Sequence, residues 1–205
     1  MTKLFALALS ASLAACSGAT PPAASPKAAP PPPTKIAVPA GAYAMDANHA
    51  SLSFSVKHLG LSNYVARFAK FDVDLMIDPE QLSASTVSVS IDPTSVRTDY
   101  PGDYKASHKK SPFSSWDEDL AQSPKFLNAA EHPEISFQST SVEALTAGKL
   151  RINGNLTLRG ITQPLTLEAM IVGSTEAHPF TSAPAIGFSA QGQFKRSAFG
   201  MDHLI

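Results

Sequence analysis

The sequence predicts an all-β fold, an antiparallel β-barrel with one short helical segment near residues 115–123. Apolar residues recur at every second position in one segment after another from Tyr43 onward, turn-forming residues separate these segments, and one stretch breaks the pattern. A period of two places apolar side chains on one face of a strand. A one-sided sheet must bury that face by closing into a barrel or packing as a sandwich. The many serines and threonines at alternate positions favour closure.

Seven segments carry the alternation. We expect strands at residues 51–57, 69–77, 87–91, 135–137, 150–158, 165–171 and 186–194. Turn sequences such as Ala147-Gly148 and Arg159-Gly160 separate neighbouring segments. Strands joined by such short turns are expected to be antiparallel neighbours.

Residues 114–130 lack the alternation. Ser115 can cap a helix there, and the residues that follow it include Asp117, Glu118 and Asp119. Carboxylates in the first turn interact favourably with the helix dipole. We therefore expect a helix of one or two turns, which also accounts for this acidic cluster without a catalytic role.

The first 41 residues do not have a globular composition. Residues 1–15 contain a basic start, an apolar run and then small residues, the layout of an export signal. Residues 16–41 are rich in proline and alanine, so we expect a semi-rigid tether there. The domain organisation expected is therefore a signal peptide, a tether and one β-barrel over residues 42–205.

The only cysteine, Cys16, directly follows Leu13-Ala14-Ala15. This sequence resembles the bacterial lipobox. The resemblance implies that Cys16 carries a lipid anchor and that palmitate is one of its chains. Because Ser17 is not the aspartate associated with inner-membrane retention, the resemblance implies a periplasm-facing lipoprotein of the outer membrane. An ordinary cleaved signal peptide is the alternative.

Composition excludes several classes of function. The formal net charge is -1 and the chain has no long basic run, so a nucleic-acid partner is not expected. The six histidines lack the spacing of a zinc or iron site, so no metal is expected. No constellation of residues supports catalysis, and we expect a protein that is not an enzyme.

Four segments stand in this order along the chain: YAMDANHASLSFSVKHLG at 43–60, FLNAAEHPEISFQST at 126–140, GNLTLRGITQP at 154–164 and RSAFGM at 196–201. Together they resemble signatures of the YceI-like family of bacterial lipid-binding proteins. The resemblance implies a lipocalin-like barrel with a long hydrophobic pocket for a polyisoprenoid lipid such as an isoprenoid quinone, with no other cofactor. Residues 99–110 look like an extra segment that could cover a barrel mouth, and similar proteins usually continue past residue 205 into a final strand.

We expect the pocket lining to come from the apolar residues of the predicted strands, if the core is hollow rather than filled. The candidates are Phe54, Val56, Phe71, Val73, Leu75, Val87, Val89, Ile91, Phe137, Ile152, Leu156, Leu158, Leu167, Ile186, Phe188 and Phe194. His49 and His58 bracket the first long strand and are candidates for head-group contact, with ordinary strand-end packing as the alternative.

The function expected is to bind, shield or transport a long apolar lipid in the cell envelope, with the membrane reached through lipidated Cys16. The alternative is an envelope protein-interaction or stress-response module that uses an exposed sheet edge or the 99–112 loop. The sequence does not predict an oligomeric state.

Overall fold

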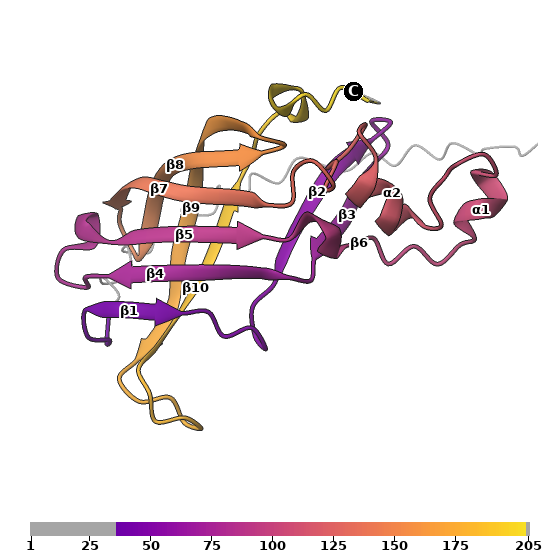
Figure 1. Cartoon of the computed structure of the whole chain (residues 1–205). Helices are drawn as coiled ribbons and strands as arrows, with labels where there is room; N and C mark the ends of the chain where they lie inside the picture. Colours follow the sequence, from indigo (N-terminus) through magenta and orange to yellow (C-terminus); the bar gives the residue numbers. More distant parts are fainter. Residues whose placement is uncertain (1–35, 204–205) are drawn as a thin grey trace, which may run out of the picture. The chain divides into compact units, whose positions relative to one another are not determined.

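The computed structural model describes residues 36–203 (Figure 1). Seven strands form one antiparallel sheet in the order β1-β4-β5-β7-β8-β9-β10. They are β1 (Gly41–Ala44), β4 (Phe71–Ile77), β5 (Thr86–Ile91), β7 (Ile135–Ala144), β8 (Lys149–Leu158), β9 (Ile161–Thr175) and β10 (Ala185–Gly192). The predicted signal peptide, Cys16 and the tether up to residue 35 lie outside the described residues.

A second, smaller sheet and several short helical turns complete this part of the chain. The small sheet has the order β2-β3-β6, with β2 (Leu52–His58), β3 (Ser62–Phe68) and β6 (Val96–Arg97). The helices are α1 (Tyr104–Ser107) and α2 (Trp116–Gln122), and the 3-10 turns are η1 (Leu82–Ala84), η2 (Pro93–Ser95) and η3 (Arg196–Phe199).

The predicted fold class is confirmed. The described chain is mostly antiparallel β, and α2 lies within the segment predicted to be helical. The seven-stranded sheet curls into a half-barrel (Figure 1). Within residues 36–203, its end strands β1 and β10 are not paired with each other.

The strand register gathers apolar residues into rows across the large sheet. Val73 lies opposite Val89, which lies opposite Phe137 on its other side. Phe137 in turn lies opposite Leu156. Directly opposed residues of antiparallel strands share one face, so this row of side chains crosses β4, β5, β7 and β8 on the same side of the sheet. The alternation in the sequence predicted this arrangement.

A tight corner separates the two sheets. The buried Ser95 hydroxyl accepts a hydrogen bond from the Lys70 amide at 2.9 Å and donates one to the Asp92 carbonyl at 2.7 Å. The Asp92 carboxylate caps η2 by accepting from the Thr94 amide at 2.8 Å and from the Thr94 hydroxyl at 2.6 Å. The strand predicted over residues 69–77 therefore begins at Phe71, because the preceding residues form this corner.

The Asp92 cap predicts a loss of stability in acid. The hydrogen bond from the Thr94 hydroxyl, followed by that from the Thr94 amide, lowers the pKa of Asp92. A carboxyl with a lowered folded pKa stabilises the fold above its unfolded pKa of about 3.9, and this contribution is lost as the pH falls through the folded value. Asp92→Asn should therefore lose less stability than the parent chain between about pH 5 and about pH 2. Urea unfolding across that range measures the difference, and parallel losses would contradict the expectation.

Helix α2 packs on the small sheet. Ser115 caps it as predicted, accepting from the Glu118 amide at 3.1 Å. The Asp117 carboxylate accepts from the Thr98 amide at 2.8 Å and from the Thr98 hydroxyl at 2.7 Å, which ties the start of the helix to the residues after β6. Ala121 packs with the buried Val96. The helix therefore closes one side of β2, β3 and β6.

The last residues of the predicted tether belong to the folded part. Val38 is buried, and the Ala37 amide donates to the Ser174 hydroxyl at 2.7 Å. Ile36 packs against the cluster that contains Ile171. Within the described residues, packing thus already involves residues 36–38, ahead of the expected residue 42, because apolar side chains precede the first strand.

Candidate functional site

The seven-stranded sheet has an apolar inner face and a polar outer face. On β4, Phe71, Val73 and Leu75 are half-buried on the inner side, whereas Asp72 and Asp74 are exposed on the other. We call the apolar side of β4, β5, β7, β8, β9 and β10 the inner face. Its width and continuity make it the candidate binding surface of the described chain.

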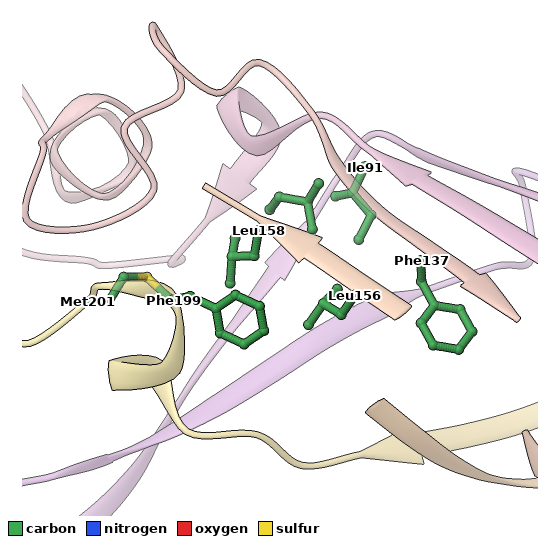
Figure 2. Packing of buried hydrophobic residues seen from close by; sticks show 7 residues of the cluster. Ile91, Phe137, Leu156, Leu158, Phe199 and Met201 are labelled. Atoms are coloured by element: carbon green, nitrogen blue, oxygen red, sulfur yellow. The ribbon is translucent and has the colours of Figure 1, made fainter. Parts of the chain in front are cut away.

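One part of the inner face is a closed core. Figure 2 shows Phe199 and Met201, which lie on and after η3, packed against Leu156 and Leu158 of β8. Phe199 is only 1% exposed. The chain therefore fills this part of the curl with its own side chains, and no ligand can occupy that space without displacing them.

The cluster extends to the ends of two more strands. Ile91 of β5 and Ile135 and Phe137 of β7 complete the buried set. Half-buried residues surround it: Leu52, Phe68, Phe71, Val87, Val89, Leu127, Ile152, Leu165 and Leu167. Sequence alternation found the strand residues of this core but missed Phe199 and Met201, because they lie in a segment without alternation.

The inner face opens toward β10. Phe188 of β10 is 38% exposed, although it lies opposite the buried Ile171 of β9. Phe194, which follows β10, is 46% exposed and packs edge-on against Phe199 with ring centroids 5.2 Å apart. Large aromatic side chains thus continue the apolar surface beyond the closed core.

The small sheet provides a second apolar surface. Phe54 of β2 and Phe68 of β3 lie with ring centroids 5.3 Å apart. Val56 lies opposite Tyr64, and both are half-buried. Tyr64 and Phe68 were not among the predicted site residues, although Tyr64, Ala66 and Phe68 show the same every-second-residue spacing that identified β2.

The predicted pocket residues therefore fall into three environments. Four are buried in the closed core and do not line an open space: Ile91, Phe137, Leu156 and Leu158. Ten are half-buried: Phe54, Val56, Phe71, Val73, Leu75, Val87, Val89, Ile152, Leu167 and Ile186. Two are exposed: Phe188 and Phe194. The four buried residues were predicted to line the pocket but do not, because Phe199 and Met201, in and after η3, fill the space that these four side chains face.

The structure does not bring the two candidate head-group residues together. His49 lies in the loop before β2, where its Nδ1 is 2.7 Å from Asp46 Oδ2. That hydrogen bond is the largest of the effects that lower the pKa of Asp46. His58 is the last residue of β2 and is exposed. The two histidines thus lie at opposite ends of one strand.

The extra segment between β6 and α2 folds against the helix. Tyr104 is buried, and its hydroxyl lies 2.7 Å from both Asp119 Oδ2 and Ser111 Oγ. Its ring stacks on His108 with centroids 4.5 Å apart, and Trp116 packs edge-on against both rings. Burial, followed by the hydrogen bond to Asp119, raises the pKa of Tyr104.

Two surface depressions lie on this extra segment. One, of about 510 Å³, is lined by residues 106–111, and the other, of about 310 Å³, by residues 98–100, 102–104 and 114–117. Neither includes a residue from the predicted pocket set. Figure 1 shows α1 beyond α2, away from the seven-stranded sheet, so this segment does not cover the inner face.

The described residues contain neither a cluster of side chains suited to a metal ion nor a helix suited to cross a membrane. No group of three or more His, Cys, Asp or Glu side chains in residues 36–203 is arranged to hold a metal ion. In the same range, no helix has the length and apolar character needed to cross a membrane.

The fold and the inner face define an antiparallel β protein whose curled sheet carries one broad apolar wall, as binding proteins of the β-barrel type do. Residues 43–204 match the YceI-like domain family. The chain belongs to this family.

Relatives with similar sequences cover most of the chain. The UPF0312 protein of Shewanella oneidensis is 36% identical over 168 residues, which are 81% of this chain and 80% of the relative. Protein YceI of Salmonella arizonae is 35% identical over 156 residues, 76% of this chain and 73% of that protein. The four segments quoted from the sequence thus identified the family correctly.

Two solved structures have the same fold. The Campylobacter jejuni YceI protein superposes with a TM-score of 0.56 at 28% identity, covering 77% of this chain and 83% of the other. Burkholderia cenocepacia BcnA superposes with a TM-score of 0.59 at 19% identity, covering 75% of this chain and 82% of the other.

Proposed function

We propose that this protein binds, shields or transports a long apolar lipid of the isoprenoid type in the bacterial cell envelope, without catalysis. One observation carries the proposal: the inner face keeps large apolar side chains partly exposed, including Phe188 at 38% and Phe194 at 46%. Family membership supports the chemical class of the ligand, because resemblance to the YceI-like family implies binding of isoprenoid-like lipids.

The geometry favours a ligand that lies along the sheet. The closed core occupies the part of the inner face around Leu158, which leaves the half-buried residues of β4, β5, β9 and β10 as contact surface. An isoprenoid chain is long, apolar and narrow, so it can cover many such residues at once. Burial of apolar surface, at about 25 cal/mol per Å², would supply the driving force before ordering costs.

Attachment to the membrane is part of the same proposal. The lipobox resemblance at Cys16 supports a lipoprotein that faces the periplasm from the outer membrane. The proline-rich residues before position 36 would separate the folded part from the bilayer. An isoprenoid quinone is the candidate ligand that we would examine first.

A substitution on the open part of the inner face tests the proposal. Phe188→Asp should weaken binding of ubiquinone at least about tenfold, because the ligand would have to desolvate a carboxylate. Val172→Asp is the matched control, since Val172 lies on the adjacent strand and is 66% exposed on the outer side. Mass spectrometry of organic extracts identifies the lipid retained by each chain, and ubiquinone titration gives the affinity. A parent chain that retains no lipid and rejects ubiquinone would refute the proposal.

The alternative function, a protein-interaction or stress-response module, retains one supporting observation. In the described part of the chain, β10 has one paired edge, to β9, and its other edge is unpaired. Unpaired strand edges are sites where another chain can add a strand. A pull-down with the parent chain and with a chain that carries a proline substitution in β10 tests this function. Recovery of the same partners by both chains would argue against it.

A further inference from the structure

The turn between β2 and β3 carries two leucines that extend into solvent. Leu59 is 74% exposed and Leu61 is 86% exposed. The Leu61 amide donates to the His58 carbonyl at 3.0 Å, which closes the turn. We call Leu59, Gly60 and Leu61 the β2–β3 tip.

The backbone conformation makes Leu59 an unexpected residue at this position. Leu59 has a φ of 52° and Gly60 a φ of 72°, so two successive residues of the turn lie in the left-handed region. Asn-Gly and Asp-Gly are the preferred pairs in such turns, because a β-carbon with a large side chain is strained there. The sequence thus places a large apolar residue where both the backbone and the solvent disfavour it.

Two other hairpins of the chain provide an internal comparison. Ala147-Gly148 joins β7 to β8 and Arg159-Gly160 joins β8 to β9, and all four residues have positive φ. Ala147 has a small side chain, and Arg159 donates to the Phe126 carbonyl at 2.8 Å. The same turn geometry is therefore compatible with residues that do not expose a large apolar group, and the geometry does not explain Leu59.

The sequence around the β2–β3 tip carries positive but no negative charge. Residues 57–63 include Lys57 and no acidic residue, which suits a surface of anionic headgroups. On the same hairpin, Val56 and Phe54 continue the apolar surface from the tip toward the clusters of the core. A lipid tail that leaves a bilayer at the tip would first meet the half-buried Val56, ahead of the cluster that α2 covers.

We propose that the β2–β3 tip inserts its two leucines into the surface of a bilayer that contains anionic lipid, where the protein collects or delivers its ligand. This inference rests on the proposed function, because a lipid carrier must contact a membrane.

The β9–β10 hairpin, which carries Phe180, provides a control position. Figure 1 shows this hairpin on the opposite side of the folded part from the β2–β3 tip. Phe180 is 92% exposed and therefore provides a position of similar exposure on a different tip.

The experiment uses the full chain with Cys16→Ser, which removes the only cysteine and with it the proposed site of the lipid anchor. A single cysteine at Leu61→Cys or at Phe180→Cys then carries an environment-sensitive dye. The chains are mixed with vesicles of phosphatidylethanolamine and phosphatidylglycerol that contain spin-labelled lipid. Quenching and a blue shift at position 61, with neither at position 180, support the proposal. Equal signals at both positions, or no signal at 61, would refute it.

A second substitution separates membrane contact from stability. Leu59→Asn introduces the preferred Asn-Gly turn, so it should raise the midpoint of thermal unfolding while reducing vesicle affinity roughly tenfold. Ala147→Asn makes the same turn change in the β7–β8 hairpin, and it should leave vesicle affinity unchanged. Unchanged vesicle affinity in Leu59→Asn would overturn the proposal.

Lipid extraction from the same preparations distinguishes a failure of the β2–β3 tip proposal from a failure of the proposed lipid-binding function. Retained lipid without contact at position 61 would refute only the role of the β2–β3 tip. Contact at position 61 in a chain that neither retains lipid nor accepts ubiquinone would refute the carrier function and leave a membrane-binding protein.

Discussion

Replacing Phe199 by alanine is expected to lower the free energy of unfolding by about 3–5 kcal/mol. Phe199 is 1% exposed and packs with Leu156, Leu158 and Met201 in the closed core. Removing its ring leaves a cavity that these neighbours cannot fill, because Leu156 and Leu158 are fixed in the β8 ladder. Urea denaturation followed by circular dichroism measures the change.

Phe180→Ala is the control for this substitution. Phe180 is 92% exposed, so the same change of residue should alter stability by less than about 0.5 kcal/mol. Similar destabilisation in both variants, or a small effect at Phe199, would show that η3 does not close the core.

Adding one methyl group at Gly154 is expected to cause the second large loss of folding stability. An ideal Cβ at this position would lie 2.5 Å from the Gln138 carbonyl oxygen and would also overlap the Phe137 ring. Phe137 is buried, and the carbonyl belongs to the backbone of β7, so neither can move away freely. We expect Gly154→Ala to destabilise the fold by about 1–3 kcal/mol through overpacking.

Gly173 provides the matched control on the neighbouring strand β9. A Cβ there would meet no atom within 4 Å. Alanine also loses less backbone entropy than glycine on folding, so Gly173→Ala should be neutral or stabilise by up to about 1 kcal/mol. Thermal unfolding of the two variants side by side tests the difference, and a Gly154→Ala chain as stable as the parent would contradict the packing described here.

The alternation of apolar residues predicted much of the large sheet. Residues of β4 and β5 such as Val73 and Val89 share a face as expected, because the period of two fixes the side on which each side chain lies. Ser115 was also identified correctly as a cap, since its hydroxyl accepts a backbone hydrogen bond at the start of α2. Both predictions depend on local chemistry, which a sequence displays directly.

Other elements depend on contacts between distant residues and were missed. Helix α1 has four residues and no periodic pattern, and Tyr104 is fixed by bonds to Ser111 and Asp119. The division into two sheets depends on the corner around Ser95. Strand β6 has only two residues, so no pattern could indicate it.

The candidate site was predicted in part for the same reason. Periodicity identified which side chains share the inner face, but it could not show that Phe199 fills part of the curl. The predicted tether extended too far along the chain, because Val38, among proline and alanine residues, packs as a core residue. Only three-dimensional packing distinguishes a buried residue from a spacer in such a composition.

Methyl NMR during titration with ubiquinone tests the central claim most directly. The account predicts that methyl signals of Val73, Leu75 and Leu167, on the inner face, shift on addition of ubiquinone. Signals of Val65 and Val172, which are 59% and 66% exposed on other surfaces, should stay in place. Shifts confined to the exposed valines, or no shifts at saturating ubiquinone, would contradict a lipid-binding inner face.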